Sequence, residues 1–276
     1  MTASHDHWND HARQWQKLGP PLRPGVGDVL LAEKLVAEAS GTSGGAPFQA
    51  ILLGVTPELA VMHWPSGTRL LAIDRCQDMI QKVWPRCPAP ATVVCADWRT
   101  LPVSDATVDV VLGDGCYTQL ENPEAYKAVS AEVMRALKPT GRFIMRFFVQ
   151  PDRAESPEAV FTDLENGRIG NFHILKWRLA MSLQECFAVG VRLGDIWEAW
   201  HAEGIDADAL SQRMNWPLNA VASIDAYRNV DTRYTFPTLA ELRACLSDYF
   251  AERSCFFPDY ELGDRCPTLT LSPRSR

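Results

Sequence analysis

Apolar runs alternate with helix-like segments through the first half of the chain. The runs fall near residues 48–53, 69–73, 91–95, 108–112 and 141–149. Each run has the length of a buried strand, and the segments between the runs have room for a helix. Because strands that alternate with helices form βαβ units, this pattern predicts an α/β fold with a doubly wound, mostly parallel sheet.

The C-terminal part of the chain is expected to add one helix and two strands to this sheet. Thr238 and Glu241 form a capping box, which predicts a helix that runs from there to about Phe250. Short apolar runs follow at residues 255–257 and 268–271. We expect these two strands to pair antiparallel, because only a short turn separates them. The complete sheet would then have seven strands.

Two regions depart from the β/α rhythm, and they divide the chain into four parts. Residues 1–45 carry helix-like segments around a proline-rich turn at residues 19–24, which predicts an N-terminal helical cover. Residues 46–150 form the α/β core, and residues 238–276 complete its sheet. Residues 151–237 carry further helix-like segments, and a stretch of this length predicts a helical insertion instead of a linker.

Composition narrows the class of protein. The 276 residues are 46% hydrophobic and 22% charged, with a net charge of −7, as expected of a globular protein. An acidic chain without clusters of Lys and Arg is not expected to bind nucleic acid. No apolar run has transmembrane length and the first residues lack signal-peptide features, so we expect a cytoplasmic protein without a membrane partner. The eight cysteines form no CxxC pair, and we expect neither a metal site nor a disulfide framework.

Two strand ends carry the candidate chemistry. The first apolar run ends at Gly54 and the second ends at Asp74. The carboxyl ends of parallel strands meet at one edge of a sheet, where a glycine leaves room for a nucleoside and an acid can bind ribose hydroxyls. A dinucleotide is less well matched, because Gly54 has no companion glycines and Pro57 lacks an N–H where a phosphate would need one. The layout therefore predicts a phosphate-free adenosine ligand.

The ordered segments of the core resemble class I S-adenosylmethionine-dependent methyltransferases. The matching segments are the turn after Leu53, the strand end at Asp74, residues 96–102 with 108–115, and the entry to the fifth strand at residues 132–142. The resemblance covers residues 46–150 well. It implies a Rossmann-like fold, S-adenosylmethionine as cofactor and S-adenosylhomocysteine as product. The family commonly has an acidic residue and several glycines in its first motif, and this chain departs from that pattern.

The resemblance implies cofactor contacts for several residues at the strand ends. Asp74 would bind the ribose hydroxyls, with a helix N-cap or an ion pair with Arg75 as the structural alternatives. Met79 would pack on the adenine and Trp98 would stack beside it, although both also suit core positions. Asp97 would accept a hydrogen bond from the adenine amino group. The remaining expected cofactor contacts are Gly54, Thr56, Pro57, Asp114 and Gly115.

The contacts to the methionine end of the cofactor stay open. Glu58 would receive the amine, or it would only complement the dipole of the helix that Thr56 and Pro57 begin. Arg23 would bind the carboxylate, or it would form a surface ion pair. Trp15 belongs to an N-terminal segment of the kind that often folds over the cofactor in this family.

Asp114 and Tyr117, just past the fourth apolar run, are the candidates for accepting a proton from the substrate. Either residue could instead be a cofactor or structural contact. Their loop lacks the Asn/Asp-Pro-Pro-Tyr motif with which similar enzymes hold the amino groups of nucleic-acid bases. In-line attack on a sulfonium methyl needs orientation and a dry site more than catalytic groups, so few conspicuous catalytic residues are expected.

We therefore expect methyl transfer to a small-molecule nucleophile, with the insertion and the N-terminal segment covering the acceptor. The alternatives are a nicotinamide-dependent oxidoreductase on the same architecture and a noncatalytic cofactor-binding or scaffold protein. The sequence leaves the oligomeric state open. Aromatic residues of the insertion suit an apolar or aromatic acceptor, or they build the core of the insertion; they are Trp177, Trp197, Trp200, Trp216, Tyr227 and Tyr234.

Overall fold

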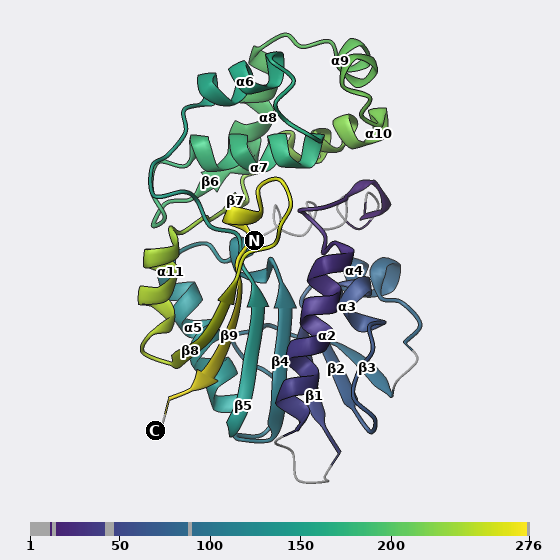
Figure 1. Cartoon of the computed structure of the whole chain (residues 1–276), viewed down its shortest axis with the longest axis vertical. Coiled ribbons are helices and arrows are strands. Elements are labelled where there is room, and N and C mark those ends of the chain that lie inside the picture. Colours follow the sequence, from purple (N-terminus) through teal and green to yellow (C-terminus); the bar gives the residue numbers. More distant parts are fainter. Residues whose placement is uncertain (1–11, 13–14, 42–46, 88–89, 275–276) are drawn as a thin grey trace.

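A central sheet forms the lower half of the molecule in Figure 1. The structure is a computed structural model, and it describes residue 12 and residues 15–41, 47–87 and 90–274. The sheet has the strand order β3-β2-β1-β4-β5-β9-β8. Its strands are β1 (Gln49–Leu53), β2 (Arg69–Asp74), β3 (Ala91–Cys95), β4 (Val108–Asp114), β5 (Leu137–Arg146), β8 (Phe250–Phe256) and β9 (Thr268–Pro273).

The direction of the strands confirms the predicted fold class. Strands β1 to β5 pair in parallel, and β9 pairs antiparallel with both β5 and β8. The order reverses beside β1, because β2 lies on one side of it and β4 on the other. This reversal is the point at which doubly wound sheets bind their ligands, at the carboxyl ends of the strands.

Helices cover both faces of the sheet. On one face lie α2 (Val26–Ser40), α3 (Pro57–Ala60) and α4 (Gln77–Val83), and on the other lie α5 (Pro123–Ala136) and α11 (Leu239–Leu246) (Figure 1). The central strand β1 is apolar along its length because both of its faces are buried. Ala50 and Leu52 pack toward Leu35 on α2, whereas Ile51 and Leu53 belong to the core on the side of α5.

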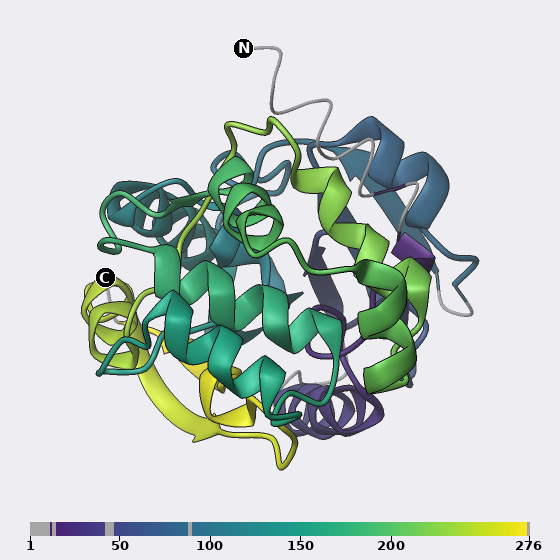
Figure 2. The same ribbon diagram turned by 90° about the horizontal axis from the view of Figure 1, so that it is seen from above.

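The insertion lies over the carboxyl ends of the strands, as the view from above shows (Figure 2). Helix α7 is its centre, and ten consecutive residues from Phe172 to Met181 are buried. Phe172 packs edge to face against Trp200, with ring centroids 5.2 Å apart. The elements of the insertion are α6 (Pro157–Glu165), α7 (Phe172–Leu183), β6 (Val191–Arg192), α8 (Leu193–Ala202), α9 (Ala207–Met214), α10 (Leu218–Val221), η3 (Ala222–Tyr227) and β7 (Arg233–Tyr234).

The predicted boundaries at the C-terminus need correction. Helix α11 ends at Leu246 instead of about Phe250, because Phe250 already pairs with Pro273 in the sheet. The connection between β8 and β9 spans residues 257–267 and contains the 3-10 turn η4 (Gly263–Arg265), so it is longer than the short turn expected. The antiparallel pairing itself is confirmed.

The N-terminal segment can be followed only in part. The first described element after residue 12 is the 3-10 turn η1 (Trp15–Lys17), and the earlier part of the predicted N-terminal helix lies outside the described residues. Within the described residues, no helix combines the length and the apolar character that crossing a membrane requires.

Candidate active site

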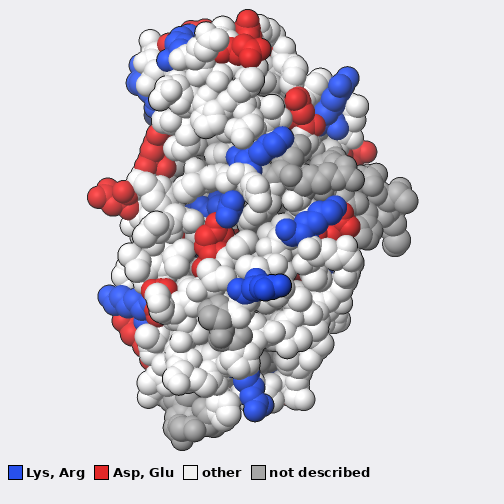
Figure 3. All heavy atoms as spheres, turned by 90° about the vertical axis from the view of Figure 1, so that its right-hand side faces the viewer, with Lys and Arg blue, Asp and Glu red and all other residues white. Residues whose placement is uncertain are grey.

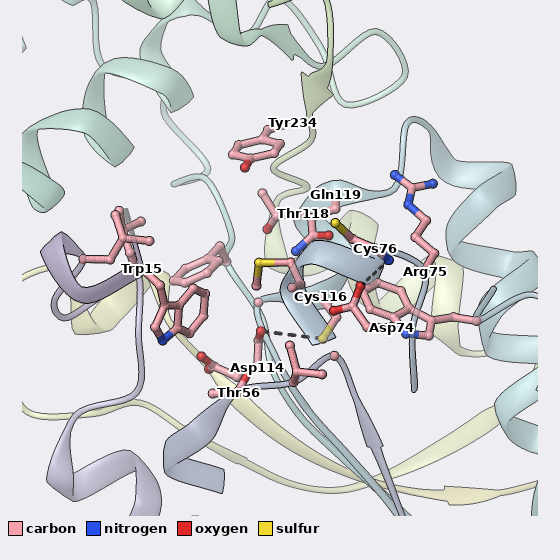
Figure 4. Close-up of a pocket in the computed structure, with 18 of the residues that line it drawn as sticks. Trp15, Thr56, Asp74, Arg75, Cys76, Asp114, Cys116, Thr118, Gln119 and Tyr234 are labelled. Carbon is pink, nitrogen blue, oxygen red and sulfur yellow. Dashed lines mark hydrogen bonds between the residues drawn. The ribbon is translucent and has the colours of Figure 1, made fainter. Parts of the chain in front are cut away.

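One cavity lies between the carboxyl ends of β1, β2 and β4 and the underside of the insertion (Figure 4). Its empty volume, which includes space open to solvent, is about 880 Å³. The lining residues are Trp15, Leu18, Leu22, Gly54, Val55, Thr56, Asp74, Arg75, Cys76, Met79, Trp98, Asp114, Gly115, Cys116, Thr118, Gln119, Phe148, Trp177, Tyr227 and Tyr234.

The end of β1 meets the end of β2 at the floor of the cavity. Gly54 has a φ of +85°, a backbone conformation that residues other than glycine rarely adopt. Its N–H donates to the Ile73 carbonyl at 2.8 Å. The same carbonyl accepts from Nε1 of Trp98 at 2.7 Å. Asp74 Oδ2 would lie 3.9 Å from a Cβ at position 54. Gly54, Asp74 and Trp98 therefore come together as predicted.

The partly buried carboxylate of Asp74 accepts only one hydrogen bond from the described residues. Its Oδ1 accepts from the Cys76 N–H at 2.8 Å, and no other described residue donates a hydrogen bond to the carboxylate. Burial raises the pKa of Asp74 to about 6, while the Cys76 N–H and the charge of Arg75 oppose the rise. The N-cap of α4 is Cys76 and not Asp74. A ligand with two neighbouring hydroxyl groups would provide the missing donors.

Asp97 lies beside the cavity and not in its lining. Its carboxylate accepts from Nε and Nη2 of Arg99 at 2.9 and 2.6 Å, and from the Arg99 N–H at 2.8 Å. These hydrogen bonds lower the pKa of Asp97. A small neighbouring hollow contains Asp97 and shares Arg75, Trp98 and Gln119 with the cavity. Met79 and Trp98, the other predicted adenine contacts, do line the cavity.

At the opposite end of the floor, Glu58 and Arg23 bind each other. Arg23 Nε donates to Glu58 Oε1 at 2.7 Å, and the Arg23 guanidinium lies 5.1 Å from the centre of the Trp15 ring. Thr56 lines the cavity but makes no side-chain cap on α3, and Pro57 and Glu58 begin that helix without lining the cavity. Arg23 thus forms a partly buried ion pair in the structure, and its contact with the cofactor carboxylate stays a prediction.

Asp114 is held by a buried arginine. Arg146, 3% exposed, donates from Nε to Asp114 Oδ1 and from Nη2 to Oδ2 at 3.0 Å. It also donates to the Pro21 carbonyl and the Tyr260 hydroxyl, both at 2.9 Å. Burial raises the pKa of Asp114, and the guanidinium opposes that rise. Arg146 occupies both carboxylate oxygens, so a substrate proton would have to compete with the guanidinium for Asp114 although this residue lines the cavity.

Tyr117 lies apart from the cavity, inside the core beneath it. The residue is 1% exposed, its hydroxyl is 3.0 Å from Ser130 Oγ, and its ring packs edge to face on Tyr126 and Phe147. Burial raises the pKa of the Tyr117 hydroxyl. This placement contradicts the predicted proton-accepting role, because a substrate in the cavity cannot reach the hydroxyl.

Several lining residues were not among the predicted site residues. Gly115 has a φ of +63°, and a Cβ there would come within 2.5 Å of Phe148, so the loop after β4 packs directly on the segment after β5. The cavity walls beyond this contact are lined by residues from loops and from the insertion, where no short motif marks them. They are Leu18, Leu22, Val55, Arg75, Cys76, Cys116, Thr118, Gln119, Phe148, Trp177, Tyr227 and Tyr234.

Solved structures share this fold at low sequence identity. The chain aligns with the CcbJ methyltransferase from Streptomyces caelestis over 99% of both chains, with a TM-score of 0.55 and 12% identity. A Rhodobacter sphaeroides protein, provisionally described as a Zn-dependent alcohol dehydrogenase, aligns over 99% of this chain and 100% of its own, with a TM-score of 0.59 and 13% identity. At such identities the likeness concerns the fold alone.

Sequence comparison relates part of the chain to methyltransferases. Residues 53–145 match the family described as "Methyltransferase domain". The malonyl-[acyl-carrier protein] O-methyltransferase of Xylella fastidiosa (strain M23) is 32% identical over 88 residues, which are 31% of this chain and 28% of that relative. The chain therefore matches less than a third of the length of this curated relative.

Strand order and cavity together define a Rossmann-like protein with a cavity at the switch point of its sheet. The match over residues 53–145 covers part of the chain and supports the resemblance of its motifs to class I S-adenosylmethionine-dependent methyltransferases. The cofactor of this class is S-adenosylmethionine, and the product that it leaves is S-adenosylhomocysteine.

Proposed function

We propose that this protein transfers the methyl group of S-adenosylmethionine to a small-molecule nucleophile by in-line displacement. The observation that carries the proposal is a single cavity with two unlike ends. One end has the glycine, carboxylate and indole expected around adenosine, and the other lies under the aromatic insertion. A shared cavity would bring donor and acceptor together in one enclosed space.

The unsatisfied polar atoms around the cavity suit this cofactor. Glu58 Oε2 and Trp15 Nε1 are buried, and within the described part of the chain neither has a hydrogen-bond partner. Both groups flank Arg23. A buried acceptor and a buried donor would match the amine and the carboxylate of a methionine moiety. Asp74 would bind the ribose hydroxyls, and Met79 and Trp98 would flank the adenine.

When bound, S-adenosylmethionine supplies a methyl group on a positively charged sulfur. The protein contributes orientation and exclusion of water. The Arg146 and Asp114 pair joins the ends of β4 and β5 to Pro21 of the N-terminal segment, so it fixes that segment against the floor of the cavity. The insertion and the N-terminal segment would then serve as the cover over the acceptor.

A small acceptor is favoured over a macromolecule by the position of the cavity. The insertion lies over it, and aromatic side chains occupy its upper wall. On the face shown in Figure 3, acidic and basic side chains alternate, and the described residues gather no continuous basic patch there. Binding to a nucleic-acid backbone depends on such clusters.

Calorimetric titration with S-adenosylhomocysteine and, separately, with NAD tests the proposal. We expect binding of S-adenosylhomocysteine, a rise in melting temperature with ligand concentration, and no binding of NAD. Binding of NAD alone would instead favour an oxidoreductase. Binding of S-adenosylhomocysteine without transfer of labelled methyl to any member of a panel of acids, phenols, amines and thiols would favour the noncatalytic alternative.

A further inference from the structure

The acceptor end of the cavity is walled by aromatic side chains. Trp177 packs edge to face on Phe148 and on Tyr234, with ring centroids 5.3 and 5.7 Å apart. Tyr227 completes this wall from η3. Figure 4 shows Tyr234 across the cavity from Asp114 and Asp74. An apolar or flat ligand would bury its surface here.

A buried cation stands behind this wall. Lys176 is 1% exposed, and its Nζ lies 5.2 Å from the centre of the Tyr227 ring. It donates to Ser223 Oγ at 2.9 Å, and that hydroxyl donates onward to the Ala220 carbonyl at 2.6 Å. No carboxylate of the described residues lies within ion-pair distance of Lys176. Burial lowers the pKa of Lys176 to about 7.

The lining offers hydrogen-bond donors to an acceptor molecule but no free base. Nε1 of Trp177 is buried, and no described residue accepts a hydrogen bond from it. Two carboxylates are found in the described lining: Asp74 lies at the adenosine end, and Asp114 is paired with Arg146. Burial raises the pKa values of Tyr227 and Tyr234, so both phenols stay protonated at neutral pH.

Building on the proposed function, we propose that the acceptor is a small apolar carboxylic acid, and that the enzyme converts its carboxylate to a methyl ester. The juxtaposition that carries this inference is an aromatic wall with an unpartnered indole N–H and the uncompensated Lys176 behind it. A carboxylate would complement both groups, because it is an anion and accepts hydrogen bonds.

The chemistry balances without a general base. A carboxylate oxygen gives its lone pair to the new O–CH₃ bond, and the electron pair of the broken S–CH₃ bond stays on sulfur. The products are a neutral ester and S-adenosylhomocysteine, and no proton moves. A phenol or an ammonium group would have to lose a proton first, and the carboxylate of the described lining that is not ion-paired, Asp74, lies at the adenosine end.

Binding to the protein saturated with S-adenosylhomocysteine tests the inference without turnover. Cinnamate and hexanoate are each compared with the corresponding amide by calorimetry, so shape is constant and charge changes. We expect each acid to bind at least tenfold more tightly than its amide. In Lys176→Met the preference should fall below about threefold, with unchanged affinity for S-adenosylhomocysteine. Lys34→Met, at an exposed position on α2, is the matched control and should keep the full preference.

Trp177→Phe provides a second variant in case Lys176→Met does not fold, because it keeps an aromatic ring in the wall while it removes the indole N–H together with the five-membered ring that carries it. It should weaken binding of the acids by three- to tenfold and leave the amides less affected. With labelled S-adenosylmethionine and either acid, the product should release methanol in mild base, as esters do.

Each contrary outcome has a distinct meaning. Equal or tighter binding of the amides, or an acid preference that persists in both variants, would overturn the inference. It would also be overturned if neither acid bound to a protein that binds S-adenosylhomocysteine. Failure to bind S-adenosylhomocysteine at all would instead overturn the proposed function on which the inference rests.

Discussion

The two ends of the cavity are built in different ways. At the adenosine end, Gly54, Asp74 and Trp98 come from short segments at the ends of neighbouring strands, and backbone hydrogen bonds position them. At the acceptor end, each lining side chain comes from a different element, such as Trp177 on α7 and Tyr234 on β7. Parallel strands bring the first set together automatically, whereas the second set depends on the packing of the insertion.

The two ends also differ in how buried charge is satisfied. Arg146 and Asp114 neutralise each other at the floor of the cavity, and Arg23 pairs with Glu58 at the methionine end of the cofactor site. Lys176 at the acceptor end has no such partner among the described residues. A buried charge without a counter-ion costs stability, so its retention is easier to understand if a ligand supplies the counter-ion.

The largest effect should come from breaking the charge pair between Arg146 and Asp114. Arg146→Met leaves the buried Asp114 without its partner, and we expect the free energy of unfolding to fall by about 3–5 kcal/mol. Urea denaturation measures the loss. Adding Asp114→Asn removes the uncompensated charge, so the double variant should be more stable than Arg146→Met alone. If the second substitution lowered stability further, the pair would not be the main source of the effect.

Asp74→Asn should weaken binding of S-adenosylhomocysteine by about 1.5–3 kcal/mol, the scale of hydrogen bonds to a charged group. Calorimetry measures the change, and Asp248→Asn at an exposed position is the matched control. An unchanged affinity in a folded Asp74→Asn protein would remove Asp74 from the cofactor site.

The same substitution should stabilise the ligand-free protein at neutral pH. The pKa of Asp74 is raised from 3.8 to about 6 in the folded chain, so the folded state binds more protons than the unfolded state between these values. The stability contribution of Asp74 is therefore lost as pH rises from about 4 through 6. We expect Asp74→Asn to gain about 1–2 kcal/mol over the unsubstituted protein between pH 4 and pH 7.5. Urea denaturation at both pH values checks the gain, and no difference between them would contradict the raised pKa.

A smaller effect is expected at the methionine end. Trp15→Ala removes a cavity-lining ring and its contact with Arg23, and affinity for S-adenosylhomocysteine should fall about three- to tenfold. Trp197→Ala, on the insertion and outside the cavity lining, should leave the affinity unchanged and is the control. Equal affinity of the Trp15 variant would show that this end of the cavity does not contact the ligand.

The contrast between the two ends explains what the sequence could predict. Strand ends and their glycine and acid are local patterns, so the sheet and the meeting of Gly54, Asp74 and Trp98 at its edge followed from the motifs. The position of Tyr117 could not be predicted in this way, because two residues past a strand end a side chain can turn toward the cavity or into the core. The pairing of Arg23 with Glu58 joins positions 35 residues apart and carries no local signal.

The acceptor end shows most clearly what could not be predicted from the sequence. Trp177, Trp200, Tyr227 and Tyr234 look alike in the sequence, yet Trp200 packs inside the insertion and the other three line the cavity. Helix α7 is buried nearly all round, so its periodicity cannot identify the face that meets a ligand. Lys176, on the same helix, has no sequence feature that predicts burial.

The smallest effect is expected at Asp97, where the motif predicted an adenine contact and the structure places an ion pair. Its two oxygens already accept hydrogen bonds from Arg99, and the side chain lies in the hollow next to the cavity. An exposed pair of this kind contributes little, so Asp97→Ala should change affinity for S-adenosylhomocysteine by less than about threefold. Calorimetry on Asp97→Ala and Asp74→Asn compares the affinities of two variants within the adenosine end. A loss of tenfold or more would mean that Asp97 exchanges Arg99 for the adenine amino group when the ligand binds, as the resemblance to the family implied.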